Sequence, residues 1–508
     1  MSTSQAGYRL HGFPGGLKMR HHKQVSCRQP PAAAEIPERL YIPIGQHQGE
    51  VGMLRVEPGE RVLKGQALTA SEDDFVVPAH ASTSGNVAGV VEWPASWPPG
   101  SSRRCIELIS DARDESVEPN PLPDWHTLDP ENIIDHLRSM GLAGLGGAMF
   151  PTAAKLRGDW NGIDTLILNG AECEPWISCD EMLMRTRPEA IIEGARILAR
   201  AVSAGRVLIA IEDPMDEVGA ALETIRREND PDNNIQIVRI PAVYPEGGER
   251  QLIQTLTGLE VPHDGLPQDL GLVCHNVATA AAAFDAVETG LALTERLVTV
   301  TGPGIAEPRN FSARIGTRIG ELVAQAGGYT DQATRLVLGG PMSGIALPTD
   351  DIPITKGSNC VLALEADQVS RPHPTLPCIN CGACVAVCPA GLLPQLLFKA
   401  VAADHDDEAA ELNLFDCIEC GCCAQVCPSH IPLVDWYRHG KDRLRLKQLD
   451  QRRASLAKRR FDARQARLEK AEAERQARRE RRRKKLAEPD QAKSEIQAAI
   501  ERARRKKD

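Results

Sequence analysis

The sequence predicts a multidomain α/β protein in which β-rich, α/β and cysteine-rich regions follow one another along the chain. Its 508 residues are enough for three or four domains. Short apolar strands and amphipathic helices alternate in its middle part, as they do where helices cover a mainly parallel sheet. Nine of the 15 cysteines lie between Cys378 and Cys427. This clustering marks a region with its own chemistry, and it argues against a secreted disulfide scaffold.

Residues 1–120 are predicted to form a β-rich domain. Short runs of strand-favouring residues are separated by Pro-Gly and Lys-Gly turns around residues 56–66, and the pattern continues through residues 76–87. The pattern resembles the barrel-sandwich of biotinyl and lipoyl domains. The carrier lysine of those domains is not evident, so we interpret this region as a structural module. Residues 111–124, rich in proline and acidic residues, are predicted to form a linker.

Residues 125–295 are predicted to form an α/β domain. Strands are expected at residues 165–169 and 206–211, and helices at 133–140, 188–204 and 216–227. The strands are short and apolar, as buried strands of a parallel sheet are. Residues 296–365 follow as a β-grasp unit, with a strand at 296–301, a helix carrying Ile319 and Leu322, and a strand at 336–338. Residues 368–436 hold the clustered cysteines.

The C-terminal part of the chain, residues 441–508, is strongly basic. It contains 26 Lys and Arg against 12 Asp and Glu, a net charge of +14, so the preceding 440 residues carry −24. Its composition favours a helix with hardly any apolar stripe. A nucleic-acid partner is not expected, because Phe461 is the only aromatic residue there. Docking to anionic lipid or to an acidic partner is the alternative. No apolar run is long enough to predict a membrane span or a secretion signal.

Two cysteine runs predict two [4Fe–4S] clusters. Each run reads C-x2-C-x2-C-x3-C-P, and the cysteines are Cys378, Cys381, Cys384 and Cys388, then Cys417, Cys420, Cys423 and Cys427. In two-cluster ferredoxins the fourth cysteine of each run binds the other cluster. One cluster is therefore assigned to Cys378, Cys381, Cys384 and Cys427, and the other to Cys388, Cys417, Cys420 and Cys423. Zinc sites pair two C-x2-C units, and neither run has that form. The region is predicted to transfer electrons.

A glycine-rich loop at residues 141–155 is a second candidate site. Glycines let the backbone approach a phosphate, and a following lysine can neutralise it, although a tight turn in a core needs the same glycines. The loop resembles the flavin loop of the NADH-oxidising 51 kDa subunit of respiratory complex I. Three further segments resemble that family in the same order: residues 169–175 with Asp180, residues 244–249, and residues 276–279.

This resemblance implies a set of cofactor contacts. It places FMN against Gly144, Gly146, Gly147, Lys155, Asn169, Glu172, Asn276 and Thr279, and the nicotinamide nucleotide against Glu174 and Glu249. The chain also departs from the family. Ala143 and Leu145 stand where the family has arginine, and Met149 stands where it has glycine. These departures leave fewer cations for the cofactor phosphates.

The whole architecture resembles the C subunits of the Rnf (or Rsx) ion-translocating oxidoreductases. The likeness covers residues from about 10 to 440 and includes the start Phe13-Pro14-Gly15-Gly16-Leu17 with Lys23. It implies an NADH-linked oxidoreductase component, peripheral on the cytoplasmic face of the bacterial inner membrane. Electrons would pass from NADH through FMN and the clusters to other subunits, or in reverse from ferredoxin. A soluble flavin reductase, such as a cobalamin reductase, and a flavin-free two-cluster relay are the alternatives.

Overall fold

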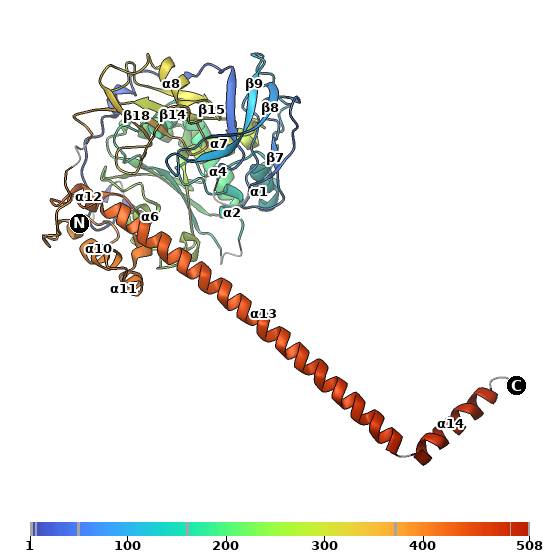
Figure 1. Ribbon diagram of the computed structural model, residues 1–508. Helices are drawn as coiled ribbons and strands as arrows, with labels where there is room; N and C mark the ends of the chain where they lie inside the picture. Colours follow the sequence, from blue (N-terminus) through green and yellow to red (C-terminus); the bar gives the residue numbers. More distant parts are fainter. Residues whose placement is uncertain are drawn as a thin grey trace. The chain divides into compact units, whose positions relative to one another are not determined.

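The computed structural model describes residues 4–5, 8–47, 51–158, 162–369, 373–487 and 489–505. The chain divides into two compact units, residues 1–437 and 438–508. The strands that the structure describes all lie in the first unit (Figure 1). A short hairpin opens that unit, formed by β1 (Ser4–Gln5) and β2 (Tyr8–Arg9).

The first sheet belongs to the N-terminal region and is antiparallel, in the order β4-β9-β8-β6. Its strands are β4 (Arg39–Pro43), β6 (Arg61–Val62), β8 (Gly85–Pro94) and β9 (Ser102–Ser110). A smaller pair, β5 (Met53–Leu54) and β7 (Thr69–Ala70), lies apart from it. Leu40, Ile42, Val62, Ile106 and Leu108 are fully buried in the core. The predicted β-rich module is confirmed.

The second sheet is parallel throughout, in the order β12-β11-β10-β13. Its strands are β10 (Thr165–Gly170), β11 (Arg206–Glu212), β12 (Ile235–Ile240) and β13 (Leu272–Asn276). Side chains of β10 point alternately to its two faces. Leu166 and Leu168 enter one core cluster, and Ile167 enters another. Because all four strands run the same way, their carboxyl ends share one edge, where α/β proteins bind ligands.

Helices cover both faces of this parallel sheet. The helices of this region are α1 (Pro130–Ser139), α2 (Thr152–Leu156), α3 (Cys179–Thr186), α4 (Pro188–Val202), α5 (Asp216–Asn229), α6 (Glu249–Thr257) and α7 (Val277–Glu288). Residues of α4 and α7 share a core cluster with Leu166, whereas residues of α6 share the cluster of Ile167. The predicted α/β arrangement is confirmed.

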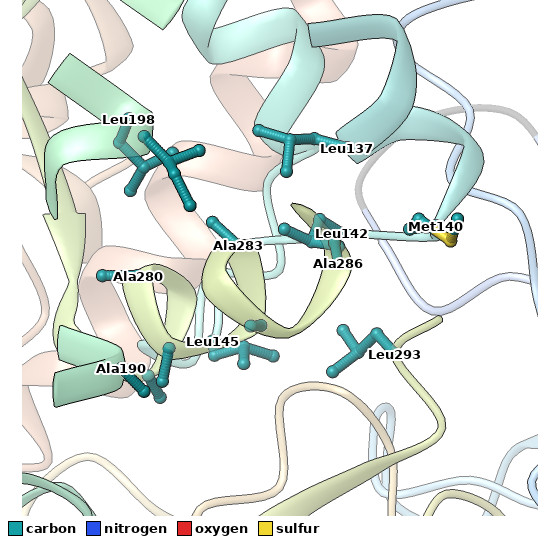
Figure 2. Packing of buried hydrophobic residues seen from close by; sticks show 14 of the residues in the cluster. Leu137, Met140, Leu142, Leu145, Ala190, Leu198, Ala280, Ala283, Ala286 and Leu293 are labelled. Atoms are coloured by element: carbon teal, nitrogen blue, oxygen red, sulfur yellow. The ribbon is translucent and has the colours of Figure 1, made fainter. Parts of the chain in front are cut away.

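The contact between α4 and α7 is unusually close. Figure 2 shows Ala280, Ala283 and Ala286 of α7 among larger side chains from the surrounding elements. Small residues on α7 let the backbone of α4 approach it. A Cβ atom on Gly194 of α4 would lie 1.9 Å from the carbonyl oxygen of Ala280. The two helices can therefore pack at this distance only with glycine at position 194.

A third sheet has six strands in the order β17-β16-β18-β14-β15-β3. They are β3 (Ala32–Ala33), β14 (Glu295–Thr301), β15 (Arg309–Arg314), β16 (Ala333–Leu338), β17 (Ile345–Ala346) and β18 (Cys360–Glu365), with α8 (Ile319–Gln325) packed against them. Strand β3 pairs with β15 although it comes from the N-terminal region. The first 40 residues thus extend beyond the β-rich module.

Short helices surround the clustered cysteines, and long helices end the chain. The short ones are α9 (Ala383–Ala386), α10 (Pro394–Ala402), α11 (Asp406–Glu411) and α12 (Cys422–Gln425). The long ones are α13 (Leu433–Ala487) and α14 (Pro489–Arg504). Among the described residues, no helix combines the length and the apolar character needed to cross a membrane.

The α4–α7 contact makes a stability prediction. Gly194→Ala should lower the free energy of unfolding by about 1–3 kcal/mol, because the added methyl group forces two backbones apart. The midpoint of thermal unfolding, followed by circular dichroism, measures this. Gly205→Ala is the matched control, since a Cβ there meets nothing within 4 Å, and it should stay within about 0.5 kcal/mol of the parent. Equal midpoints for the two variants would contradict the account of this contact.

Candidate functional site

A cavity of about 670 Å³ lies at the carboxyl edge of the parallel sheet. We call it the central cavity. It is lined by residues of the α/β region, of the third sheet and of the second cysteine run. Among the residues predicted to contact cofactor or nucleotide, those in its wall are Gly146, Gly147, Asn169, Glu172, Glu174, Glu249 and Asn276. Gly144, Lys155 and Thr279 do not line it, and their contacts are described below.

Two asparagines at the ends of parallel strands organise the cavity floor. The Nδ2 of Asn169, on β10, donates to the carbonyl of Gly247 at 2.8 Å. The Nδ2 of Asn276, at the end of β13, donates to the Asp180 carboxylate at 2.6 Å. The Oδ1 of Asn276 also accepts from the backbone N–H of Ala278 and caps α7. These bonds fix both side chains where the strands end.

The glycine-rich loop forms another wall, and its conformation is held from behind. The N–H of Gly144 donates to the carbonyl of Phe150 at 2.8 Å. The N–H of Leu145 donates to the hydroxyl of Thr279, a fully buried residue, at 3.0 Å. Gly147 has a φ of +99°, and a Cβ there would meet nothing within 4 Å. The loop thus presents bare backbone to open space, which suits a phosphate-bearing cofactor such as FMN.

Lys155 is engaged with Glu249. Its Nζ lies 2.6 Å from Oε1 of Glu249. The resemblance had placed these two residues against different ligands, FMN for Lys155 and the nicotinamide nucleotide for Glu249. In the structure each neutralises the other, and Glu249 lines the central cavity whereas Lys155 does not.

Glu174 is held by the turn between β16 and β17. Its carboxylate accepts from the N–H of Met342 at 3.2 Å and from the N–H of Ser343 at 2.8 Å, and the Ser343 hydroxyl donates to it as well. A Cβ on Gly340 would lie 2.2 Å from Oε2 of Glu174, so the turn fits around the carboxylate only with glycine there. Burial raises the pKa of Glu174, and these hydrogen bonds lower it.

A buried cation lies beneath the cavity. The Nζ of Lys23 lies 3.3 Å from Oε2 of Glu212 and 3.6 Å from Oε2 of Glu172. All three side chains are almost completely buried. Burial raises the pKa of Glu172 to about 7, against the lowering effect of Lys23. The pKa of Lys23 is raised because its nearby carboxylates outweigh burial, which alone would lower it. Sequence reasoning missed Glu212; its only signal was a carboxylate at the end of an apolar strand.

The eight predicted cluster ligands line two separate cavities. The first cysteine cavity is lined by Cys378, Cys381, Cys384 and Cys427, and the second by Cys388, Cys417, Cys420 and Cys423. Each set of four joins three cysteines of one run with the last cysteine of the other. The loops repeat one backbone geometry, with positive φ at Asn380 and Gly382 and at their counterparts Glu419 and Gly421. Four thiols around one space fit a [4Fe–4S] cluster.

The central cavity and the second cysteine cavity share part of their walls. Ile418 and Cys420 line both. The hydroxyl of Tyr244, which also lines the central cavity, donates to the carbonyl of Cys420 at 2.8 Å. Among the residues that the structure describes, the first cysteine cavity shares no lining residue with the central cavity. The second cysteine cavity is therefore the nearer of the two.

The buried triad makes a pH-dependent prediction. Lys23→Met should cost about 3–5 kcal/mol of stability, because it leaves two buried carboxylates without their cation. A carboxyl group with a raised folded-state pKa favours the folded state at low pH and loses that contribution as pH rises through the raised value. The deficit relative to the parent should therefore be larger at pH 8 than at about pH 5.5. Denaturant titrations at both pH values measure it.

Lys18→Met is the control for this prediction, because Lys18 is exposed in the same segment. It should change stability by no more than about 0.5 kcal/mol at either pH. The double variant Lys23→Met with Glu212→Gln should recover part of the loss. A pH-independent deficit in Lys23→Met would contradict the role given to the carboxylates.

Four family profiles match consecutive parts of the chain. Residues 11–113 match the RnfC barrel sandwich hybrid domain, 137–285 the Nuo51 FMN-binding domain, 297–346 the SLBB domain, and 377–431 the 4Fe-4S dicluster domain. The matches confirm the predicted fold classes and the two predicted cofactors, FMN and [4Fe–4S] clusters. A solved NAD⁺-reducing [NiFe]-hydrogenase in its air-oxidised state matches 60% of this chain and 61% of its own at 21% identity, with a TM-score of 0.45. That similarity supports no argument about function.

Curated relatives match nearly the whole chain. Proteins named as the C subunit of an ion-translocating oxidoreductase complex are 43% identical in Pseudomonas aeruginosa, 42% in Erwinia tasmaniensis and 41% in Yersinia pestis. The matches cover 98%, 95% and 100% of this chain, and 66%, 60% and 81% of the relatives. The chain thus spans less than two thirds of the length of the first two. At this identity and coverage, it belongs to the family of the C subunits of ion-translocating oxidoreductase complexes.

Proposed function

We propose that this chain passes electrons between NADH and partner subunits, using FMN in the central cavity and two [4Fe–4S] clusters. One observation carries the proposal: Cys420 and Ile418 line both the central cavity and the second cysteine cavity. A cofactor in one cavity and a cluster in the other would be separated by a shared wall. Such proximity is what transfer of single electrons requires.

FMN, when bound, accepts an electron pair as hydride and releases electrons singly, which neither NADH nor a cluster can do. The chain's own residues would hold and orient the cofactor. Gly146 and Gly147 offer bare backbone, and Asn169 and Asn276 offer amides fixed at the strand ends. Glu172 is the buried group that can hold a proton at the cavity wall, because burial raises its pKa to about 7. Lys155 and Thr279 support the site from behind.

The nicotinamide nucleotide is assigned to the end of the cavity near Glu174 and Glu249. Both residues line the cavity. Glu174 is already bonded to Ser343, so a ribose or amide donor would share or replace that bond. This assignment places the turn between β16 and β17 beside the nucleotide.

The cysteines divide the electron path into two steps. Cys388, Cys417, Cys420 and Cys423 hold the cluster next to the central cavity. Cys378, Cys381, Cys384 and Cys427 hold the more distant cluster, which exchanges electrons with partners. The partners are the other subunits of an Rnf-type complex, and ferredoxin in the reverse direction. The complex moves the ion, and this chain lies peripherally on the cytoplasmic face of the inner membrane. The basic residues 441–508 can dock on anionic lipid or an acidic partner.

Cofactor content of the full chain, purified anaerobically, tests the function. We expect about eight irons per chain, FMN near one per chain, and bleaching of both chromophores by NADH. NADPH serves as the control for nucleotide selectivity. Iron near eight without flavin, even after reconstitution, would leave a two-cluster relay and overturn the FMN assignment. Full activity without co-purifying membrane partners would favour a soluble flavin reductase.

Crossed ligation makes a separate prediction. Cys388→Ser and Cys417→Ser lie in different runs but should damage the same cluster, so that iron falls toward about four per chain. The electron paramagnetic resonance signal of the surviving cluster should be the same in both variants. Cys422→Ser is the control, since Cys422 belongs to neither predicted set, and it should keep about eight irons. If Cys388→Ser instead matched Cys378→Ser, each run would hold its own cluster.

A further inference from the structure

Residues 13–17, which we call the N-terminal strap, lie between the flavin-type region and the cysteine region. Leu17 and Tyr244 exchange two backbone hydrogen bonds, Leu17 N–H to Tyr244 at 2.7 Å and Tyr244 N–H to Leu17 at 2.9 Å. The N–H of the adjacent Gly16 donates to the carbonyl of Val387 at 3.1 Å. The strap therefore bonds to Tyr244 of the central cavity and, one residue away, to the neighbour of the cluster ligand Cys388.

Two consecutive glycines let the strap fit into this space. Gly15 has a φ of +69°, and a Cβ there would lie 2.5 Å from the carbonyl carbon of Val387 and 2.8 Å from that of Cys388. Gly16 has a φ of +81°, and a Cβ there would lie 2.8 Å from a methyl group of Val243. Because the Gly15 clash is with backbone, a side chain there would force the strap and the cysteine region apart.

Further contacts cross the same junction. The hydroxyl of Tyr244, whose side chain is buried, donates to the carbonyl of Cys420, and Nε2 of Gln251 donates to the carbonyl of Pro389 at 3.3 Å. Tyr244 and Cys422 are buried members of a small apolar cluster. Its other members are Leu17, Met19, Cys173, Met342, Val387 and Cys420. The strap thus packs on the wall that separates the central cavity from the second cysteine cavity.

We propose that the N-terminal strap is a positioning element that sets the spacing between the central cavity and the nearer cluster. This inference rests on the proposed function, and Gly15 is its key residue. Its neighbours form backbone hydrogen bonds to both regions, Gly16 to Val387 of the cysteine region and Leu17 to Tyr244 of the flavin-type region. The strap therefore holds the two regions at one fixed separation. A wider separation would slow electron transfer while leaving both cofactors in place.

Hydrogen–deuterium exchange of the full chain tests the physical part of this proposal. In Gly15→Ala, the amides of Gly16, Leu17 and Tyr244 should exchange at least about tenfold faster than in the parent. Gly12→Ala is the matched control, because a Cβ at Gly12 meets nothing within 4 Å, and it should exchange like the parent. Iron and flavin contents should be unchanged in both variants. Parent-like exchange in Gly15→Ala would overturn the proposal.

Rapid mixing with NADH tests the functional part. NADH delivers two electrons as hydride, and each cluster accepts one of them. We expect Gly15→Ala to reduce its flavin at the parental rate and its clusters at least about tenfold more slowly, equivalent to about 1.4 kcal/mol in the barrier. Gly12→Ala should match the parent in both phases. Parental cluster reduction in Gly15→Ala would refute the positioning role. A parent protein that NADH does not reduce would instead refute the proposed function, with the exchange result still standing.

A milder variant decides the case if Gly15→Ala does not fold. Tyr244→Phe deletes only the hydroxyl that reaches Cys420 and adds no atom. It should shift the reduction potential of one cluster downward, because a donor near that cluster is lost. It should leave the other cluster unchanged. Loss of this hydrogen bond across the junction should also speed exchange of the Leu17 amide. Parental exchange there, together with parental cluster reduction, would overturn the proposal.

Discussion

The buried ammonium group of Lys23 makes the acidic edge of the parallel sheet possible. Glu172 follows β10 and Glu212 ends the neighbouring β11, so their carboxylates converge at one buried edge. A charge moved out of water without a partner costs several kcal/mol. Lys23 contacts both carboxylates, at 3.6 and 3.3 Å. Charged groups can therefore be buried beneath the floor of the central cavity.

The same N-terminal segment ties the electron-carrying regions together. Lys23 anchors it under the sheet edge, and the strap at residues 13–17 passes between Tyr244 and Val387. Farther along, Ala32 and Ala33 join the third sheet. One short stretch thus contacts three regions in succession. These contacts include buried charge, backbone hydrogen bonds and the close fit of glycine, and each of these is sensitive to a single substitution.

The sequence predicted the features that depend on local spacing. The spacing of the two cysteine runs predicted the two sets of four that line the two cysteine cavities. Short apolar strands between helical segments indicated a parallel sheet. Contacts between residues far apart in the sequence could not be predicted. Lys23 and Glu212 are 189 residues apart, and Glu174 and Ser343 are 169 apart. A sequence shows that a charge exists but not which opposite charge the fold brings to it. For the same reason the pairing of Lys155 with Glu249 could not be predicted.

The central cavity is formally acidic, yet it is assigned a cofactor with a phosphate. Its charged wall residues are Glu172, Glu174, Asp180, Glu249 and Arg250. Burial raises the pKa of Glu172, Glu174 and Asp180 and so disfavours their charged forms. Glu249 is offset by Lys155. Ala143 and Leu145 bring no cation to the glycine loop, which leaves backbone N–H groups as the donors of that wall for the proposed cofactor. Uncharged donors on that wall would hold such a cofactor less tightly than cations would, which makes its retention during purification a direct measure of this site.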